Sequence, residues 1–121
     1  MSAAFQGHAA VVKTLLAKGA DPNALDQSRK TAMVLAAGTG KSEVVQALLE
    51  FGQDANARYR NDLTALMWAA GNGDAESVKV LLKAKADPSL RDNRGKTALA
   101  VARELGQKEI VDLLEAAGAT E

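Results

Sequence analysis

Residues 64–73 read TALMWAAGNG and carry a complete set of signals for one short helix. The Thr64 hydroxyl can accept a hydrogen bond from the free amides of the first turn. Leu66 and Ala69 lie three residues apart and therefore share one face of the helix. Gly73 can end the helix, because glycine adopts a left-handed conformation without strain. The stretch therefore predicts a helix of about two turns between Thr64 and Gly73.

This stretch belongs to a unit that repeats every 33 residues along the chain. Four kinds of residue keep that step through four copies without a slip. They are Gly7, Gly40, Gly73 and Gly106; Val12, Val45, Val78 and Val111; Leu15, Leu48, Leu81 and Leu114; and Ala3, Ala36, Ala69 and Ala102. A fixed period of this length indicates one small unit stacked on copies of itself. A stacked array offers a continuous surface, so we expect a partner-binding role in preference to catalysis in a pocket.

A second helix is predicted over residues 74–84, directly after the first. Val78, Leu81 and Leu82 follow the i, i+3, i+4 spacing of one apolar helix face. Glu76 lies in the first turn, where a negative charge suits the positive end of the helix dipole. Each repeat therefore contains two short helices joined by a tight turn.

Glycine ends the second helix in three copies, at Gly19, Gly52 and Gly118, and Lys85 takes that position in the third copy. If the third copy ends its helix in the same way, Lys85 adopts a positive φ angle. The segments that follow, 20–23, 53–56 and 86–89, hold Asp with Asn or Ser and both prolines of the chain. This composition predicts an extended turn that leads to the next copy.

Two blocks of this unit resemble the ankyrin repeat. The blocks Thr31-Ala32-Met33, Thr64-Ala65-Leu66 and Thr97-Ala98-Leu99 are similar to that family's Thr-Pro-Leu-His block, with Ala where Pro is usual. Residues 19–23, Gly-Ala-Asp-Pro-Asn, are similar to its Gly-Ala-Asp-x-Asn block. The resemblance covers essentially the whole chain and includes the family's 33-residue length.

The resemblance implies an all-α solenoid of stacked helix-turn-helix units joined by β-hairpin loops. We expect one domain, residues 1–121, with a partial repeat at about 1–25, repeats at 26–58 and 59–91, and a C-terminal cap at 92–121. In the family, the hairpin tips and the row of first helices form a concave surface that binds other proteins. The resemblance therefore implies a non-enzymatic protein-protein interaction module.

Several positions depart from the family pattern. Val34, Met67 and Ala100 replace the His of the Thr-Pro-Leu-His block, so we expect its hydrogen bond to the Thr region to be absent throughout. Tyr59 replaces the Asp that usually opens the hairpin, which Asp26 and Asp92 retain. The hairpin glycine remains only as Gly95, and the other two copies have Arg29 and Asp62 at that position.

The two ends of the array also differ. Glu115 occupies a position that Leu16, Leu49 and Leu82 fill elsewhere, as expected for a terminal repeat with a polar outer face. The first copy keeps its apolar residues and begins inside its first helix, at about Ala3. We therefore expect the chain to be the C-terminal piece of a longer array, or to be covered at its N-terminal end by further repeats or another chain.

The composition favours no catalytic, cofactor or metal site. The chain has no cysteine and a single histidine, His8, which follows a helix-ending glycine. Residues 38–42, Gly-Thr-Gly-Lys-Ser, end like a phosphate-binding loop, but Leu35 stands where that motif needs glycine. No apolar run approaches the about 18 residues of a membrane span, and residues 1–10 lack the pattern of a signal peptide. The compartment stays open, with the cytoplasm favoured.

Charge is distributed unevenly, although the 15 basic and 15 acidic residues cancel. The three hairpin segments carry seven basic residues against three acidic ones, which indicates either an ordinary solvated hairpin rich in arginine or a surface that attracts an acidic protein or peptide. The predicted partner-binding residues fall into three groups. The electrostatic contacts are Lys30, Arg58, Arg60, Arg91, Arg94 and Lys96; the apolar anchors are Tyr59, Leu63 and Trp68; the polar rim is Gln27, Asn61 and Asn72.

Two alternatives remain open at this point. The chain could be an engineered, reconstructed or excised repeat scaffold that has no partner of its own. It could also bind phosphate or nucleic acid weakly through the arginine-rich hairpins. The zero net charge and the lack of aromatic residues interleaved with the basic ones disfavour nucleic acid.

Overall fold

A computed structural model of the chain describes residues 42–120 together with Met33 and Ala37, except for the side chain of Arg60. These residues form α-helices, one short 3-10 helix and turns, and they contain no strand. The α-helices are α4 (Ser42–Glu50), α5 (Ala65–Gly71), α6 (Ala75–Lys83), α7 (Ala98–Glu104) and α8 (Lys108–Ala116), and the 3-10 helix is η1 (Arg60–Asp62). The all-α repeat fold expected from the sequence is therefore confirmed.

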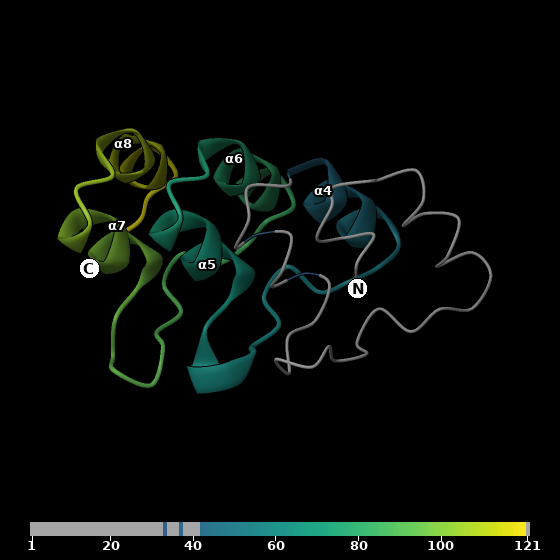
Figure 1. The fold of residues 1–121 in the computed structure, drawn as a ribbon, viewed down its shortest axis with the longest axis horizontal. Coiled ribbons are helices and arrows are strands. Elements are labelled where there is room, and N and C mark those ends of the chain that lie inside the picture. The colour runs from purple at the N-terminus through teal and green to yellow at the C-terminus, as the bar shows by residue number, and fades with distance from the viewer. Residues whose placement is uncertain (1–32, 34–36, 38–41, 121) are drawn as a thin grey trace.

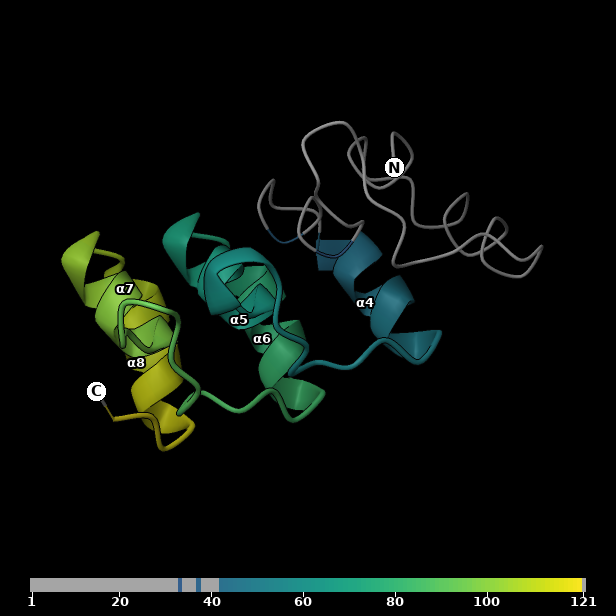
Figure 2. The same cartoon turned by 90° about the horizontal axis from the view of Figure 1, so that it is seen from below.

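The helices lie in two rows (Figure 1). The first helices of the repeats, α5 and α7, form one row, and the second helices, α4, α6 and α8, form the other. Within a repeat, α5 packs on α6 and α7 packs on α8. Between repeats, α5 packs on α7, α4 on α6, and α6 on α8, so that the units stack side by side (Figure 2). Each unit therefore buries its apolar face on its neighbours, as the repeat predicts.

Threonine caps begin both described first helices, as predicted. Thr64 accepts a hydrogen bond from the Met67 amide at 3.3 Å, and Thr97 accepts one from the Ala100 amide at 3.2 Å. Each cap satisfies an amide that has no partner inside the helix. The equivalent Thr31 lies outside the described residues.

The expectation that the hydrogen bond of the family histidine is lost in every copy is wrong for the third copy. There, the Thr64 amide donates to the Met67 sulfur at 3.5 Å, which completes a reciprocal capping box. A thioether sulfur is a weak acceptor, but it reaches the same amide. Ala100 has no acceptor in its side chain, and Val34 lies outside the described part of the chain.

Lys85 adopts the positive φ angle that the sequence predicted for it. Its φ of 68° matches the left-handed conformation of Gly52 and Gly118, with φ of 111° and 88°. The Ala86 amide then donates to the Leu81 carbonyl at 2.9 Å, which closes the helix end. The third copy therefore ends its second helix like its neighbours, but with a lysine in a conformation that favours glycine.

The core is built from the positions that keep the 33-residue step. Val45, Val78, Leu48, Leu81 and Leu114 are all fully buried. The first helices contribute buried leucines and alanines, Leu66, Leu99, Ala69 and Ala102. At the end of the array, Glu115 is exposed on α8 and forms an ion pair with Arg103 at 2.7 Å. Glu115 is thus the polar outer residue that the sequence predicted for a terminal repeat.

Candidate functional site

Two loops extend from the row of first helices, and we call them the first finger (residues 58–64) and the second finger (residues 91–97). Figure 1 shows both on the side of α5 and α7 that faces away from the other helix row. Both close with the same pair of backbone bonds. In the first finger, the Tyr59 amide donates to the Leu63 carbonyl at 2.8 Å and the Asp62 amide to the Tyr59 carbonyl at 3.0 Å. The expected β-hairpins are therefore tight turns, with one isolated antiparallel bridge between Arg58 and Thr64.

The second finger repeats this pattern around a buried carboxylate. The Asp92 amide donates to the Lys96 carbonyl and the Gly95 amide to the Asp92 carbonyl, both at 2.9 Å. The side chain of Asp92 is only 1% exposed and accepts from the Arg94 and Lys96 amides at 2.8 and 3.0 Å. It also pairs with the Arg94 guanidinium at 2.7 Å. Asp92 therefore organises the second finger.

The pKa of Asp92 lies below its ordinary value. Burial is the largest influence and would raise it, but the hydrogen bonds from Lys96 and Arg94 and the charge of Arg94 together outweigh burial. The Asp92 carboxyl group is therefore ionised at neutral pH, and this charged form accepts the hydrogen bonds that hold the second finger together.

Tyr59 takes the position of Asp92 in the first finger. Its ring packs against the hydrophobic core, and its hydroxyl oxygen is buried without a hydrogen bond to the described residues. Burial, followed by the nearby charge of Asp54, raises the pKa of Tyr59 to about 12. An aromatic ring thus replaces the carboxylate as the buried element of this finger.

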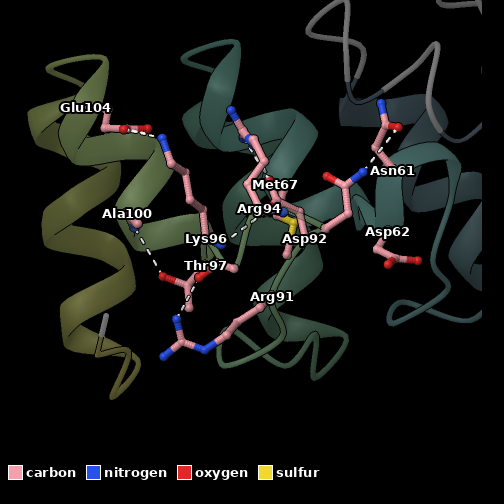
Figure 3. A network of polar contacts seen from close by, with 12 residues as sticks. Asn61, Asp62, Met67, Arg91, Asp92, Arg94, Lys96, Thr97, Ala100 and Glu104 are labelled. Carbon is pink, nitrogen blue, oxygen red and sulfur yellow. Dashed lines mark hydrogen bonds and ion pairs between the residues drawn. The ribbon is translucent and has the colours of Figure 1, made fainter.

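The two fingers are joined by hydrogen bonds. The Arg58 guanidinium donates to the Arg91 carbonyl at 2.6 Å. At the tips, the Asn93 amide donates to the Asn61 carbonyl at 3.0 Å, and the two side-chain amides meet at 3.4 Å (Figure 3). Arg58 and Arg91 lie one repeat apart, and Asn61 and Asn93 lie 32 residues apart. These bonds join the two fingers, which present one surface.

The predicted cations fall into two classes. Arg94 and Lys96 are neutralised locally, by Asp92 and by Glu104 (Figure 3). Arg58 and Arg91 donate to backbone carbonyls instead, and no carboxylate of the described residues pairs with either guanidinium. Among the described cations of the two fingers, Arg58 and Arg91 are therefore the ones whose positive charge no carboxylate of the described residues neutralises. Gln27, Lys30 and the side chain of Arg60 lie outside the part of the molecule that the structure describes.

A groove of about 300 Å³ lies between α5 and α7, at the base of the fingers. We call it the α5–α7 groove; it is lined by Leu63, Met67, Trp68, Gly71, Asn72, Arg94 and Val101. Four of these, Leu63, Trp68, Asn72 and Arg94, were predicted from the sequence as partner-binding residues. The structure brings these four together, but it places Tyr59 and the exposed Asn61 outside the groove lining.

Sequence reasoning missed three residues of the groove. Val101 lies one repeat after Trp68, so the 33-residue step could have placed it on the same face. Met67 precedes Trp68, and the sequence marks it only as the residue that replaces the family's histidine. Gly71 received no role from the sequence, and nothing in the sequence alone shows that it lines a groove.

A second cavity, of about 400 Å³, lies in the other helix row between α4 and α6. Its lining is Gln46, Leu49, Glu50, Lys79, Val80, Lys83 and Ala84, none of which was predicted as a site residue. Within residues 42–120, no three His, Asp or Glu side chains come together as a metal-binding group. No helix in that range is both long and apolar enough to cross a membrane.

Comparison with known proteins supports the repeat architecture. A search of curated proteins found no significant relative. The family model for ankyrin repeats (three copies) matches residues 1–92 and 51–120, which together cover almost the entire chain. The stacked helix pairs, the threonine caps and the paired fingers agree with that match. The chain belongs to the ankyrin repeat family.

Proposed function

We propose that this chain is a non-enzymatic module that binds a protein or peptide through its finger face, meaning the two fingers and the exposed side of α5 and α7. Ankyrin repeats are generally protein-protein interaction modules. The single observation that carries the proposal is the α5–α7 groove. It gathers Leu63, Trp68, Asn72 and Arg94 from two fingers and a helix into one open depression.

The chemistry of this groove is that of an interaction surface. Trp68 and Leu63 are half-buried, so each leaves apolar area available to a partner. Tryptophan and arginine are the residue types most enriched at the energetic centres of protein interfaces. Asn72 is exposed at the end of α5 and offers an amide for the polar rim of a contact.

The charge of the finger face favours an acidic partner. Arg58 and Arg91 form no ion pair with the described residues, whereas Arg94 on the groove is already paired with Asp92. Such charges raise association rates by steering an oppositely charged partner. The partner we infer is therefore an acidic protein segment.

Selection from a random-peptide library on the immobilised chain tests the proposal. We expect enrichment of sequences rich in Asp and Glu, and loss of about tenfold or more in affinity for Trp68→Ala. Arg58→Glu combined with Arg91→Glu should slow association, and added salt should reduce the difference. Lys83→Glu, on the other helix row, is the matched charge-reversal control and should bind like the parent chain.

Three outcomes would contradict the proposal. Selected peptides that bind the finger-face variants as well as the parent chain would place the site elsewhere. Enrichment of no sequence would favour a scaffold without a partner of its own. Tight, salt-sensitive binding of a single-stranded DNA oligonucleotide, abolished by the arginine reversals, would favour the phosphate-binding alternative.

A further inference from the structure

We propose that the α5–α7 groove receives one leucine-sized apolar side chain from an acidic segment of the partner, and that Gly71 keeps the groove open for it. The inference rests on the proposed function, because it assigns a specificity to the same surface. It is carried by an observation of its own, the missing side chain at position 71.

Backbone conformation does not explain the glycine at this position. Gly71 is the last residue of α5, and its φ is not in the left-handed region, in contrast to Gly73 at 71°. A Cβ atom added there would lie 3.6 Å from Val101 Cγ1 and 4.0 Å from Leu105 Cδ1, which are ordinary contact distances. Alanine would therefore fit, and would also favour the helix.

The next repeat has a long side chain at the position equivalent to Gly71. Glu104 lies one 33-residue step after Gly71, and its side chain reaches back to pair with Lys96. In the third repeat, position 71 contributes no side chain of its own, and the nearest neighbours of an added Cβ are Val101 and Leu105. The glycine thus leaves room beside Val101 and Trp68, both of which line the groove. What Gly71 provides is open space.

The groove suits an apolar side chain. Leu63, Met67, Trp68 and Val101 supply most of its lining. Leu105 is 57% exposed and lies next to Gly71, so it extends the apolar surface beyond the groove. A volume of about 300 Å³ is at the lower end for ligand sites. We therefore assign it to a single side chain and the backbone next to it.

The flanking charges determine which segment carries that side chain. Arg94 lines the groove, and Arg58 and Arg91 are the first residues of the two fingers, outside the groove lining and joined to each other by a hydrogen bond. Since Arg58 and Arg91 have no carboxylate partner among the described residues, carboxylates next to the apolar residue in the bound segment would complement the charge of the finger face. The exposed Asn72 amide can hydrogen-bond the backbone of the same segment.

Three short synthetic peptides serve as probes, and the fluorescence of Trp68, the only tryptophan of the chain, serves as the readout. The first has leucine between glutamates, the second has alanine between glutamates, and the third has leucine between lysines. We expect the leucine–glutamate peptide to bind about tenfold more tightly than the alanine–glutamate peptide, because it buries more apolar surface. The lysine peptide should not bind measurably.

Two substitutions at one position test the role of Gly71. Gly71→Leu should fill the groove and lower the affinity for the leucine–glutamate peptide to that of the alanine–glutamate peptide. Gly71→Ala is the control and should stay within about twofold of the parent chain, because its Cβ makes only ordinary contacts. Both replacements favour the helix, so circular dichroism should show that neither variant unfolds.

The outcomes separate this inference from the proposed function. Equal affinities for the leucine and alanine peptides, or no effect of Gly71→Leu, would overturn the subsite, while sensitivity to the arginine reversals would still support the finger face. No binding by either glutamate peptide would overturn the acidic, apolar occupant, even if library selection had yielded other sequences. Library peptides indifferent to every finger-face variant would count against the proposed function itself.

Discussion

The third and fourth repeats fold their fingers with the same backbone bonds but stabilise them with different chemistry. In the fourth, the buried Asp92 carboxylate accepts two backbone amides and one guanidinium. In the third, the half-buried Tyr59 packs its ring on the core and offers no carboxylate to those amides. The two fingers therefore share their closing bonds, with a buried carboxylate in one and an apolar ring in the other. Their backbones differ at Asn61, whose φ of 62° has no counterpart at the equivalent Arg94.

The left-handed positions of the two repeats differ in another way. Gly95 and Gly118 of the fourth repeat have φ of 79° and 88°. The equivalent residues of the third repeat, Asp62 and Lys85, have φ of 61° and 68°. A side chain in this region costs conformational energy that glycine avoids. The third repeat keeps the conformation of the fourth at both positions and bears this cost.

The largest expected effect follows from removing the Asp92 carboxylate, which organises the second finger. Asp92→Ala should lower the free energy of unfolding by about 2–3 kcal/mol, because it leaves the part-buried Arg94 and Lys96 amides without their acceptor. Urea denaturation measures this loss. Asp62→Asn, which removes the charge of an exposed carboxylate at the tip of the first finger but keeps a side chain that tolerates a left-handed φ, is the control and should change stability by less than about 0.5 kcal/mol.

The Asp92 carboxylate should also make the free energy of unfolding decrease at acid pH. The pKa of Asp92 is lower in the folded chain than its ordinary value, so its contribution is complete above the unfolded pKa of about 4. It is lost as the pH falls from there through the folded value. Asp92→Asn should flatten this part of the stability profile, and an unchanged slope below about pH 4 would show that other carboxylates cause the acid dependence.

Tyr59 occupies the position of Asp92 in the first finger, and removing its hydroxyl group should raise the stability of the protein. Tyr59→Phe removes a hydroxyl whose oxygen is buried without a hydrogen bond to the described residues, so we expect stabilisation of about 1 kcal/mol. Thermal denaturation measures the gain. A loss of similar size would mean that the hydroxyl has a partner and that both fingers depend on a buried polar contact.

Alkaline titration supplies a second measurement on Tyr59. Its pKa of about 12 in the folded chain exceeds the unfolded value of about 10, so the folded state retains a proton that the unfolded state loses. Stability should therefore fall as the pH rises from about 10 to about 12, and less steeply in Tyr59→Phe. The chain has one tyrosine, so the ultraviolet absorbance of tyrosinate reports this residue alone.

The features that the sequence predicted are those that every repeat shares. Thr64, Thr97 and Lys85 could be assigned because a position one step away had the same cap or turn. The sequence also predicted one patch of Trp68, Leu63 and Tyr59, and the groove lining contains the first two but not Tyr59. Met67 as a cap acceptor could not be predicted, because that bond depends on the path of one flexible side chain.

The local neutralisation of Arg94 and Lys96 was hidden for a related reason. Net charge along the sequence counts every arginine equally, but the fold pairs Arg94 with Asp92 and Lys96 with Glu104. Arg58 and Arg91 instead donate to carbonyls of the finger backbone. Only the folded geometry separates cations that are used internally from those that remain available to a partner.

A smaller effect is expected where the third repeat ends its second helix. Lys85→Gly should stabilise the chain by up to about 1 kcal/mol, because glycine adopts the φ of 68° without steric cost. The melting temperature measures the gain. Gly52→Ala is the reciprocal control: its added Cβ meets no atom within 4 Å, so any destabilisation comes from its φ of 111° alone. No gain from Lys85→Gly would mean that the lysine stem makes compensating contacts.

The smallest effect is expected at the tip of the first finger. Asp62→Gly copies Gly95 into the third repeat and should stabilise the chain by about 0.5 kcal/mol, less than Lys85→Gly, because Asp tolerates the left-handed region better than Lys. Gly95→Asp in the second finger is the mirror substitution and should destabilise it by a similar amount. Melting temperatures of both variants and of their double mutant measure the pair. Opposite and nearly additive shifts would show that positions 62 and 95 are equivalent, whereas a loss from both would mean that Asp62 stabilises the first tip in a way the fourth repeat does not share.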